Sequence, residues 1–179
     1  LGIGVRAGAE VVPGFAPTVR GNILYLDWEA SQARLDTRIK RICAGHGIAP
    51  VVIGYRRCNV PLADQVEAVL RYCQSEGVVL VIVDSVEMAM NGTGGDSSNP
   101  NDKGSVLHSA LRLLNCPTIL IDHINAVGRL ASKGAGKPIG GVYKTNLARM
   151  AWELRKSPDS LKHGEVKLGL FNIKRNDDG

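Results

Sequence analysis

The most constraining feature of this sequence is a run of six apolar residues, Val78 to Val83, that ends at Asp84. A continuous run of this length, rich in β-branched side chains, is typical of a strand that is covered on both faces. Strands of this kind form parallel sheets, in which helices connect one strand to the next. The run therefore predicts an α/β fold.

The rest of the chain alternates between strand and helix patterns. Residues 1–8 read as the end of a helix closed by Gly8, because glycine readily takes the left-handed conformation that ends helices. The predicted strands are 22–28, 51–55, 78–83 and 117–122, and the predicted helices are 30–44, 61–77 and 103–114. Polar loops are expected at 90–102 and 125–141. Right-handed βαβ units would place helices on both faces of one mostly parallel sheet.

The carboxyl-terminal part follows a different pattern. Residues 150–154 and 165–173 look like two strands joined by a Ser-Pro-Asp-Ser turn region. They predict an antiparallel hairpin at the edge of the sheet.

Composition limits the class of protein. With 179 residues, of which 44% are hydrophobic, the chain is long enough for one domain with a sizeable core. No apolar run approaches the length needed to span a bilayer, and no signal peptide is visible. Four cysteines without C-x-x-C spacing favour reduced thiols in a cytoplasmic protein. The net charge of +5 permits a polyanionic partner without requiring one.

Polar residues follow each apolar run at its carboxyl end. In an open α/β sheet, ligands bind beyond the carboxyl ends of the strands. Acids that hold metal-bound water or activate water, together with cations for phosphate, are what a metal–nucleotide site requires. The residues at these positions are Asp27 and Glu29, Arg56 and Arg57, Asp84 and Ser85, Asp122 and His123, and Lys174 and Arg175.

Four segments resemble the RecA-like ATPase fold. VVLVIVDS resembles a Walker B strand, NILYLDWE the strand carrying the catalytic glutamate, and CPTILIDHINAVG the sensor strand. KPIGGVYKTNLARMAWELRK with GEVKLGLFNIKRNDDG resembles the closing hairpin with its basic tip. Their order and spacing are nearest to the RepA-like branch of hexameric replicative helicases, and the resemblance covers essentially the whole chain.

This resemblance implies roles for the acids at the strand ends. Asp84 would hold Mg²⁺ through water, with Ser85 beside it, and Glu29 would be the general base for the attacking water. Asp84 could instead simply cap a turn, and Glu29 could be a first-turn glutamate favoured by the helix dipole. Asp27 could point to the same edge or cap the following helix.

The resemblance also implies partners. His123 would be a sensor that couples the γ-phosphate to the DNA-binding loops. Lys174 and Arg175 would reach across a subunit interface, and Lys133 and Lys137 could follow the phosphates of single-stranded DNA. The expected assembly is a homo-hexameric ring that uses ATP and Mg²⁺. The segments 96–103 and 129–137 would be loops facing its central channel.

One family motif is missing. The phosphate-binding loop G-x-x-x-x-G-K-[ST] does not occur, and Gly134-Ala135-Gly136-Lys137 does not fit it, because Ala131 stands where the first glycine should be. The loop would be expected just upstream of Leu1, so we expect residues 1–179 to be a single ATPase core cut at both ends. Alone, it should bind nucleotide weakly.

Two other functions stay open at this stage. The first is a recombinase-like or regulatory RecA-like ATPase that does not unwind DNA. The second is a nucleotide-independent scaffold or DNA-binding module that truly lacks the phosphate loop. An ATP hydrolysis assay distinguishes the three functions. A helicase predicts hydrolysis that DNA stimulates, a recombinase-like or regulatory ATPase predicts hydrolysis indifferent to DNA, and a scaffold predicts no hydrolysis.

Overall fold

A computed structural model describes residues 1–92, 100–123, 148–156 and 166–175, with side chains described for all of these except 100–102. The chain divides into two compact units, Leu1–Asp122 and His123–Gly179. Each unit is described by itself below, and the organisation as a single ATPase core stays a prediction.

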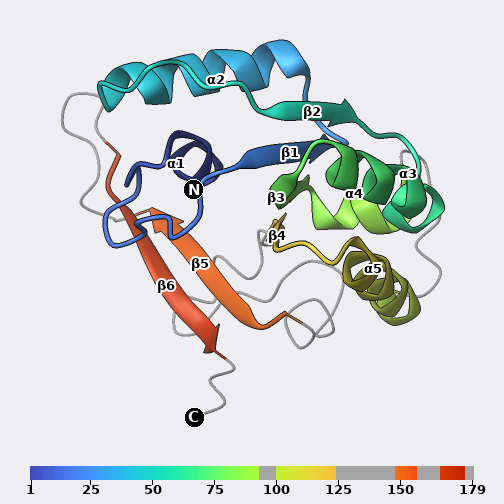
Figure 1. Cartoon of the computed structure of the whole chain (residues 1–179). Coiled ribbons are helices and arrows are strands. Elements are labelled where there is room, and N and C mark those ends of the chain that lie inside the picture. The colour runs from blue at the N-terminus through green and yellow to red at the C-terminus, as the bar shows by residue number, and fades with distance from the viewer. Residues whose placement is uncertain (93–99, 124–147, 157–165, 176–179) are drawn as a thin grey trace. The chain divides into compact units, whose positions relative to one another are not determined.

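The first unit is built on a parallel sheet of four strands in the order β2-β1-β3-β4 (Figure 1). The strands are β1 (Asn22–Asp27), β2 (Gly54–Arg57), β3 (Val78–Asp84) and β4 (Thr118–Ile121). Asp27 pairs in register with Arg57 on one side and Asp84 on the other. The strands therefore end level with one another, and their carboxyl ends form one edge.

Helices cover both faces of this sheet, as the sequence predicted. The helices are α1 (Gly2–Ala7), α2 (Gln32–Gly45), α3 (Leu62–Ser75), α4 (Val86–Asn91) and α5 (Pro100–Leu114). Alternate residues of β1 point to opposite faces because strand side chains have a period of two. Ile23 and Tyr25 pack with α1 and α2, whereas Leu24 and Leu26 pack with α3, α4 and α5.

Glycine and proline set several helix boundaries where the sequence placed them. Gly8 ends α1 with a left-handed φ of 73°, and its N–H donates to the carbonyl of Gly4. Pro61 immediately precedes α3, and Gly77 follows that helix with a φ of 58°. Glycine can take a left-handed φ because it has no Cβ, and proline has a fixed φ that suits the start of a helix. Both residue types therefore set these boundaries locally.

Two predicted boundaries in the first unit are wrong. The strand predicted at 51–55 is shifted to Gly54–Arg57, because pairing with Leu24–Asp27 fixes its register; Ile53 is buried in the core without belonging to the strand. The loop predicted at 90–102 is shorter, since α4 extends to Asn91 and α5 begins at Pro100.

The second unit contains the predicted antiparallel pair, β5 (Met150–Lys156) and β6 (Leu168–Arg175). The pair forms its own two-stranded sheet and is not an edge of the four-stranded one, which corrects the sequence-based expectation. Local contacts hold it together. Arg155 forms an ion pair of 2.6 Å with Glu153, and its guanidinium lies 4.8 Å from the centre of the Phe171 ring.

Among the helices that the structure describes, none combines the length and the apolar character needed to cross a membrane.

Candidate active site

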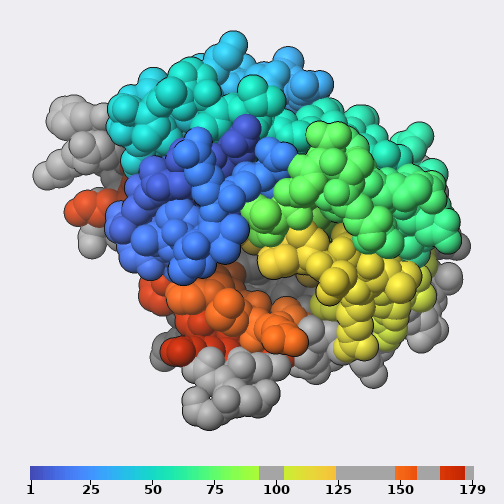
Figure 2. Space-filling view, viewed as in Figure 1, coloured from blue at the N-terminus to red at the C-terminus, as the bar shows by residue number. Residues whose placement is uncertain are grey.

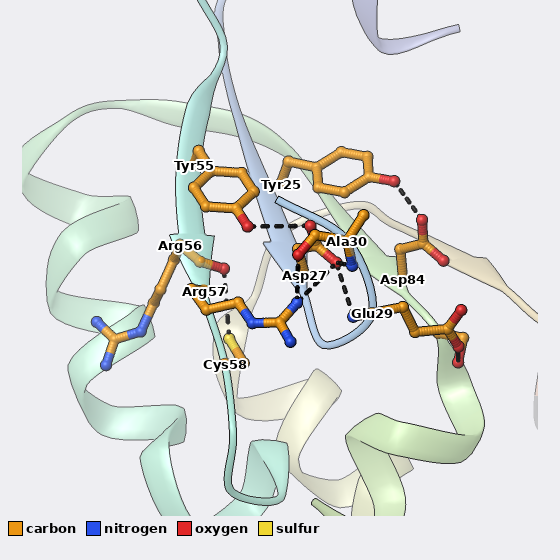
Figure 3. Close-up of polar contacts among 10 residues, drawn as sticks. Tyr25, Asp27, Glu29, Ala30, Tyr55, Arg56, Arg57, Cys58 and Asp84 are labelled. Carbon is orange, nitrogen blue, oxygen red and sulfur yellow. Dashed lines mark hydrogen bonds and ion pairs between the residues drawn. The ribbon is translucent and has the colours of Figure 1, made fainter. Parts of the chain in front are cut away.

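The candidate site lies at the carboxyl edge of β1 and β3, within the first unit (Figure 3). The in-register pairing of Asp27 with Asp84 brings the ends of the two strands together. Beyond these ends, the backbone N–H of Trp28 donates to the carbonyl of Asp84 at 2.9 Å, which extends the pairing by one residue. Residues that follow either strand are therefore held at one place.

Asp27 stabilises the turn that leaves β1. Its side chain is fully buried, and its Oδ1 accepts the backbone N–H groups of Glu29 at 2.8 Å and Ala30 at 2.7 Å. Tyr55 donates its hydroxyl to Oδ2 at 3.0 Å, and Arg57 lies 3.6 Å from Oδ1. Every oxygen of this carboxylate is in use, so the structure assigns Asp27 to the turn rather than to the reaction.

This turn presents the side chain of Glu29 at the edge. Glu29 is exposed, and its Oε1 accepts a hydrogen bond from the hydroxyl of Ser85, which is fully buried. The two residues are contributed by adjacent strands, fifty-six positions apart in the sequence. Ser85 thus orients the glutamate through its Oε1.

Asp84 is held from the other side by Tyr25. The Tyr25 hydroxyl donates to Oδ2 of Asp84, and the ring packs in the core beneath α2. A carboxylate oxygen of Glu29 and one of Asp84 lie within 4.8 Å of each other. The two acids therefore form a pair whose orientations are set by two different hydroxyl donors.

Both tyrosines remain hydrogen-bond donors at physiological pH. Burial raises the pKa of Tyr25, and the hydrogen bond to Asp84 raises it further. Burial likewise raises the pKa of Tyr55, followed by its hydrogen bond to Asp27. A phenol next to a carboxylate keeps its proton, because ionisation would place two negative charges side by side.

This donor set fits Mg²⁺. The ion prefers hard oxygen ligands, and it is commonly held by one or two carboxylates together with waters and substrate phosphates. Glu29 and Asp84 supply carboxylate oxygens, and Ser85 supplies a hydroxyl oxygen. Asp84, which is only partly exposed, is the residue that would hold the ion, while the exposed Glu29 faces solvent water.

The cations predicted near this edge have other partners or lie elsewhere. Arg57 donates to the carbonyl of Ala30 at 2.7 Å, besides its contact with Asp27, and Arg56 donates to Gln65 at 3.2 Å. Lys103 belongs to α5, not to a loop, and donates to the Asn91 side chain at 2.9 Å.

The second unit carries the remaining predicted residues. His123 is its first residue and follows Asp122 directly after β4. Lys174 and Arg175 lie opposite Ala151 and Met150, at the open end of the strand pair. The expectation of a basic hairpin tip is therefore wrong, because the last residues of β6 pair with the first residues of β5. Lys133 and Lys137 lie outside the described residues.

Sequence reasoning missed the two tyrosines. Each lies two residues before a strand-end residue, so it shares that residue's face of the sheet. Tyr25 precedes Asp27 and Tyr55 precedes Arg57, and the two tyrosines pair in register. A phenol on a core-facing position close to a strand-end acid is the signal that would have identified them.

The chain has a RecA-like α/β fold. Residues 5–129, more than half of the chain, match the family described as AAA domain, so the chain belongs to that family. No curated protein matches the chain.

Solved structures support the fold. One that matches is a KaiC-like protein from the hyperthermophilic archaeon Pyrococcus horikoshii OT3, with a TM-score of 0.57 and 13% sequence identity. The match covers 88% of this chain and 66% of that chain, just under two thirds of its length. At this identity the likeness concerns the fold.

Proposed function

We propose that this domain hydrolyses ATP with Mg²⁺ and that it drives a RepA-like replicative helicase along single-stranded DNA. The observation that carries the ATPase assignment is the meeting of Glu29 and Asp84 at one sheet edge, each oriented by a hydroxyl donor. Membership of the AAA domain family supports a nucleotide as the ligand.

The two acids differ in exposure, and this difference supports different roles. Glu29 is exposed and is oriented by the hydrogen bond from Ser85, and a carboxylate that water can reach is suited to accept a proton from an attacking water. Asp84 is partly buried and held through Oδ2 by Tyr25, which leaves Oδ1 to orient metal-bound water. Mg²⁺, when bound, would neutralise charge on the phosphates.

The coupling to DNA rests on the family resemblance. In this proposal His123 links the state of the phosphates to the DNA-binding loops, which include Lys133 and Lys137. Lys174 and Arg175 act on the neighbouring subunit of a hexameric ring, where a cation stabilises charge that develops in the transition state.

The first experiment replaces the proposed base. Glu29→Gln keeps the shape of the side chain and its contact with Ser85 but removes the proton acceptor. General base catalysis typically contributes about 10²–10⁴-fold, so ATP turnover should fall by that order while ATP binding is kept. The assay compares ATP binding and ATP turnover of the variant with those of the parent protein.

Glu67→Gln is the matched control, since it makes the same chemical change on α3 at a side chain that is 86% exposed. It should leave turnover unchanged. Unchanged turnover in Glu29→Gln would remove Glu29 from the base role. Adding single-stranded DNA tests the coupling: stimulated hydrolysis supports the helicase, whereas hydrolysis indifferent to DNA favours a regulatory ATPase.

A further inference from the structure

The charge on α2 is segregated by helix face. The helix has four cations and one acid, and three of the cations are arginines at positions 34, 38 and 41. With a helix turning about 100° per residue, Arg34, Arg38 and Arg41 lie within an arc of about 60°. Asp36 lies on the opposite flank, one turn before Lys40. We call Arg34, Arg38 and Arg41 the arginine stripe.

The stripe faces solvent. All three arginines are exposed, whereas Ile39 and Cys43 turn the other side of α2 into the core. In the space-filling view the light blue and cyan atoms of α2 form the upper margin of the first unit (Figure 2). Among the described residues, no acid forms an ion pair with any arginine of the stripe.

The stripe is unfavourable for the helix itself. Arg34 and Arg38 are four residues apart and Arg38 and Arg41 are three apart, so like charges are neighbours on the helix surface, which weakens a helix. Packing of α2 on the sheet compensates for this repulsion in the isolated domain. A bound polyanion would remove the repulsion altogether.

The opposite side of the sheet lacks this excess of positive charge. The cations of α1 and α2, Arg6 included, outnumber their single acid. On the other side, the described side chains of α3, α4 and α5 carry equal numbers of acids and cations, namely Asp64, Glu67 and Glu87 against Arg71, Lys103 and Arg112. A polyanion would therefore be attracted more strongly to the α2 face than to the opposite face.

We propose that the arginine stripe of α2 binds the phosphate backbone of a nucleic acid. From Arg34 to Arg41 the helix rises about 10 Å, so the three guanidinium groups are spread along a length that spans neighbouring phosphates of one strand. Arginine suits this ligand, since its planar guanidinium can donate two hydrogen bonds to one phosphate. No aromatic residue occurs in α2, so the contact would be indifferent to base sequence. The choice of nucleic acid over other polyanions rests on the proposed function.

Salt dependence of binding tests the stripe. Anisotropy of a labelled single-stranded oligothymidylate is measured with the full chain, without nucleotide, at several NaCl concentrations. Each lost phosphate contact should reduce the slope of log K against log salt by about 0.7. At 0.1 M salt, Arg38→Gln should thus bind about 5-fold more weakly, and the triple glutamine variant about 100-fold more weakly.

Lys40→Gln is the matched control, because it removes one charge from the same helix on the flank that carries Asp36. It should bind within about twofold of the parent chain. The variant with lysine at all three stripe positions retains the charge and should retain the salt slope. Lys40→Gln shows how much binding is lost through net charge alone, and the triple lysine variant shows whether substitution at the stripe positions disturbs folding.

Three results would overturn the proposal. In the first, the parent chain does not bind the labelled oligothymidylate at all. In the second, Lys40→Gln weakens its binding as much as Arg38→Gln does. In the third, polyglutamate displaces the labelled oligothymidylate as effectively as unlabelled DNA does. The last would assign the stripe to an acidic protein. Because binding is measured without ATP, failure here leaves the hydrolysis proposed for Glu29 intact, and the reverse also holds.

Discussion

At the scale of residues, Tyr25 and Tyr55 are neighbours in the sheet that hold different carboxylates. Tyr25 donates to Asp84, the proposed metal-holding acid, whereas Tyr55 donates to Asp27, the acid of the turn. The same chemical group thus serves the candidate site at one position and the backbone at the other. This contrast provides a test of the site with a built-in control.

We expect Tyr25→Phe to raise the Mg²⁺ concentration that gives half-maximal ATP hydrolysis. The ring still fills the core, but Oδ2 of Asp84 loses its donor and the carboxylate is less well oriented. One such hydrogen bond is worth about 0.5–1.5 kcal/mol, which corresponds to a rise of about 2–10-fold. Titrating Mg²⁺ at saturating ATP measures the effect.

Tyr55→Phe should leave the Mg²⁺ titration unchanged and lower the free energy of unfolding by about 1 kcal/mol. If both variants shift the Mg²⁺ requirement equally, or if neither does, Tyr25 has no specific role at the metal-binding acid.

At the scale of elements, the end of α4 depends on one glycine. Gly92 has a φ of 69° and a ψ of −178°, a conformation that residues with a Cβ rarely adopt. A Cβ there would lie 2.9 Å from Cδ of Pro61 and 3.1 Å from the carbonyl oxygen of Asn59. Both the backbone conformation and the packing against the start of α3 therefore require glycine.

Gly92→Ala should lower the free energy of unfolding by about 2 kcal/mol. Gly45→Ala is the comparison: Gly45 lies in the last turn of α2 with open space around it, so alanine should be neutral or stabilise by up to about 1 kcal/mol. Urea unfolding followed by circular dichroism compares the two. Equal stabilities would show that the turn after α4 can relax around a side chain.

At the scale of the molecule, the sheet of the first unit separates two hydrophobic cores, and three cysteines lie within them. Cys43 packs beneath α2, whereas Cys58 and Cys73 pack on the side of α3. All the cysteines are free thiols, as the sequence predicted. Burial raises the pKa of Cys73 to about 11, with a further contribution from the nearby Cys116.

This pKa predicts slow alkylation of Cys73 in the folded protein. At pH 8 roughly one thiol in a thousand is ionised, and the rate should rise about tenfold per pH unit up to pH 10. The folded thiol keeps its proton above the ordinary pKa of 9.0, so its contribution to stability is present below pH 9 and is lost as the pH rises towards 11. Iodoacetamide labelling followed by mass spectrometry gives the rates, and rapid labelling at pH 8 would contradict the burial of this thiol.

The sequence by itself determined the alternation of strands and helices and the positions of Glu29 and Asp84 at strand ends. It could do so because apolar runs, glycines and prolines act within a few residues. It did not predict α4, which begins at Val86 and overlaps the predicted polar loop only at its last two residues. A helix of six residues is too short to show a clear helical period.

Only the tertiary structure decided what each strand-end residue touches. Asp27 and Asp84 occupy equivalent places in the sequence pattern, yet the first binds the backbone of its own turn and the second accepts from Tyr25. Likewise, the strand pair of the second unit could be read from its sequence, but its separation from the four-stranded sheet could not. Local periodicity fixes which face a side chain occupies, whereas pairing between distant strands fixes which partner it meets.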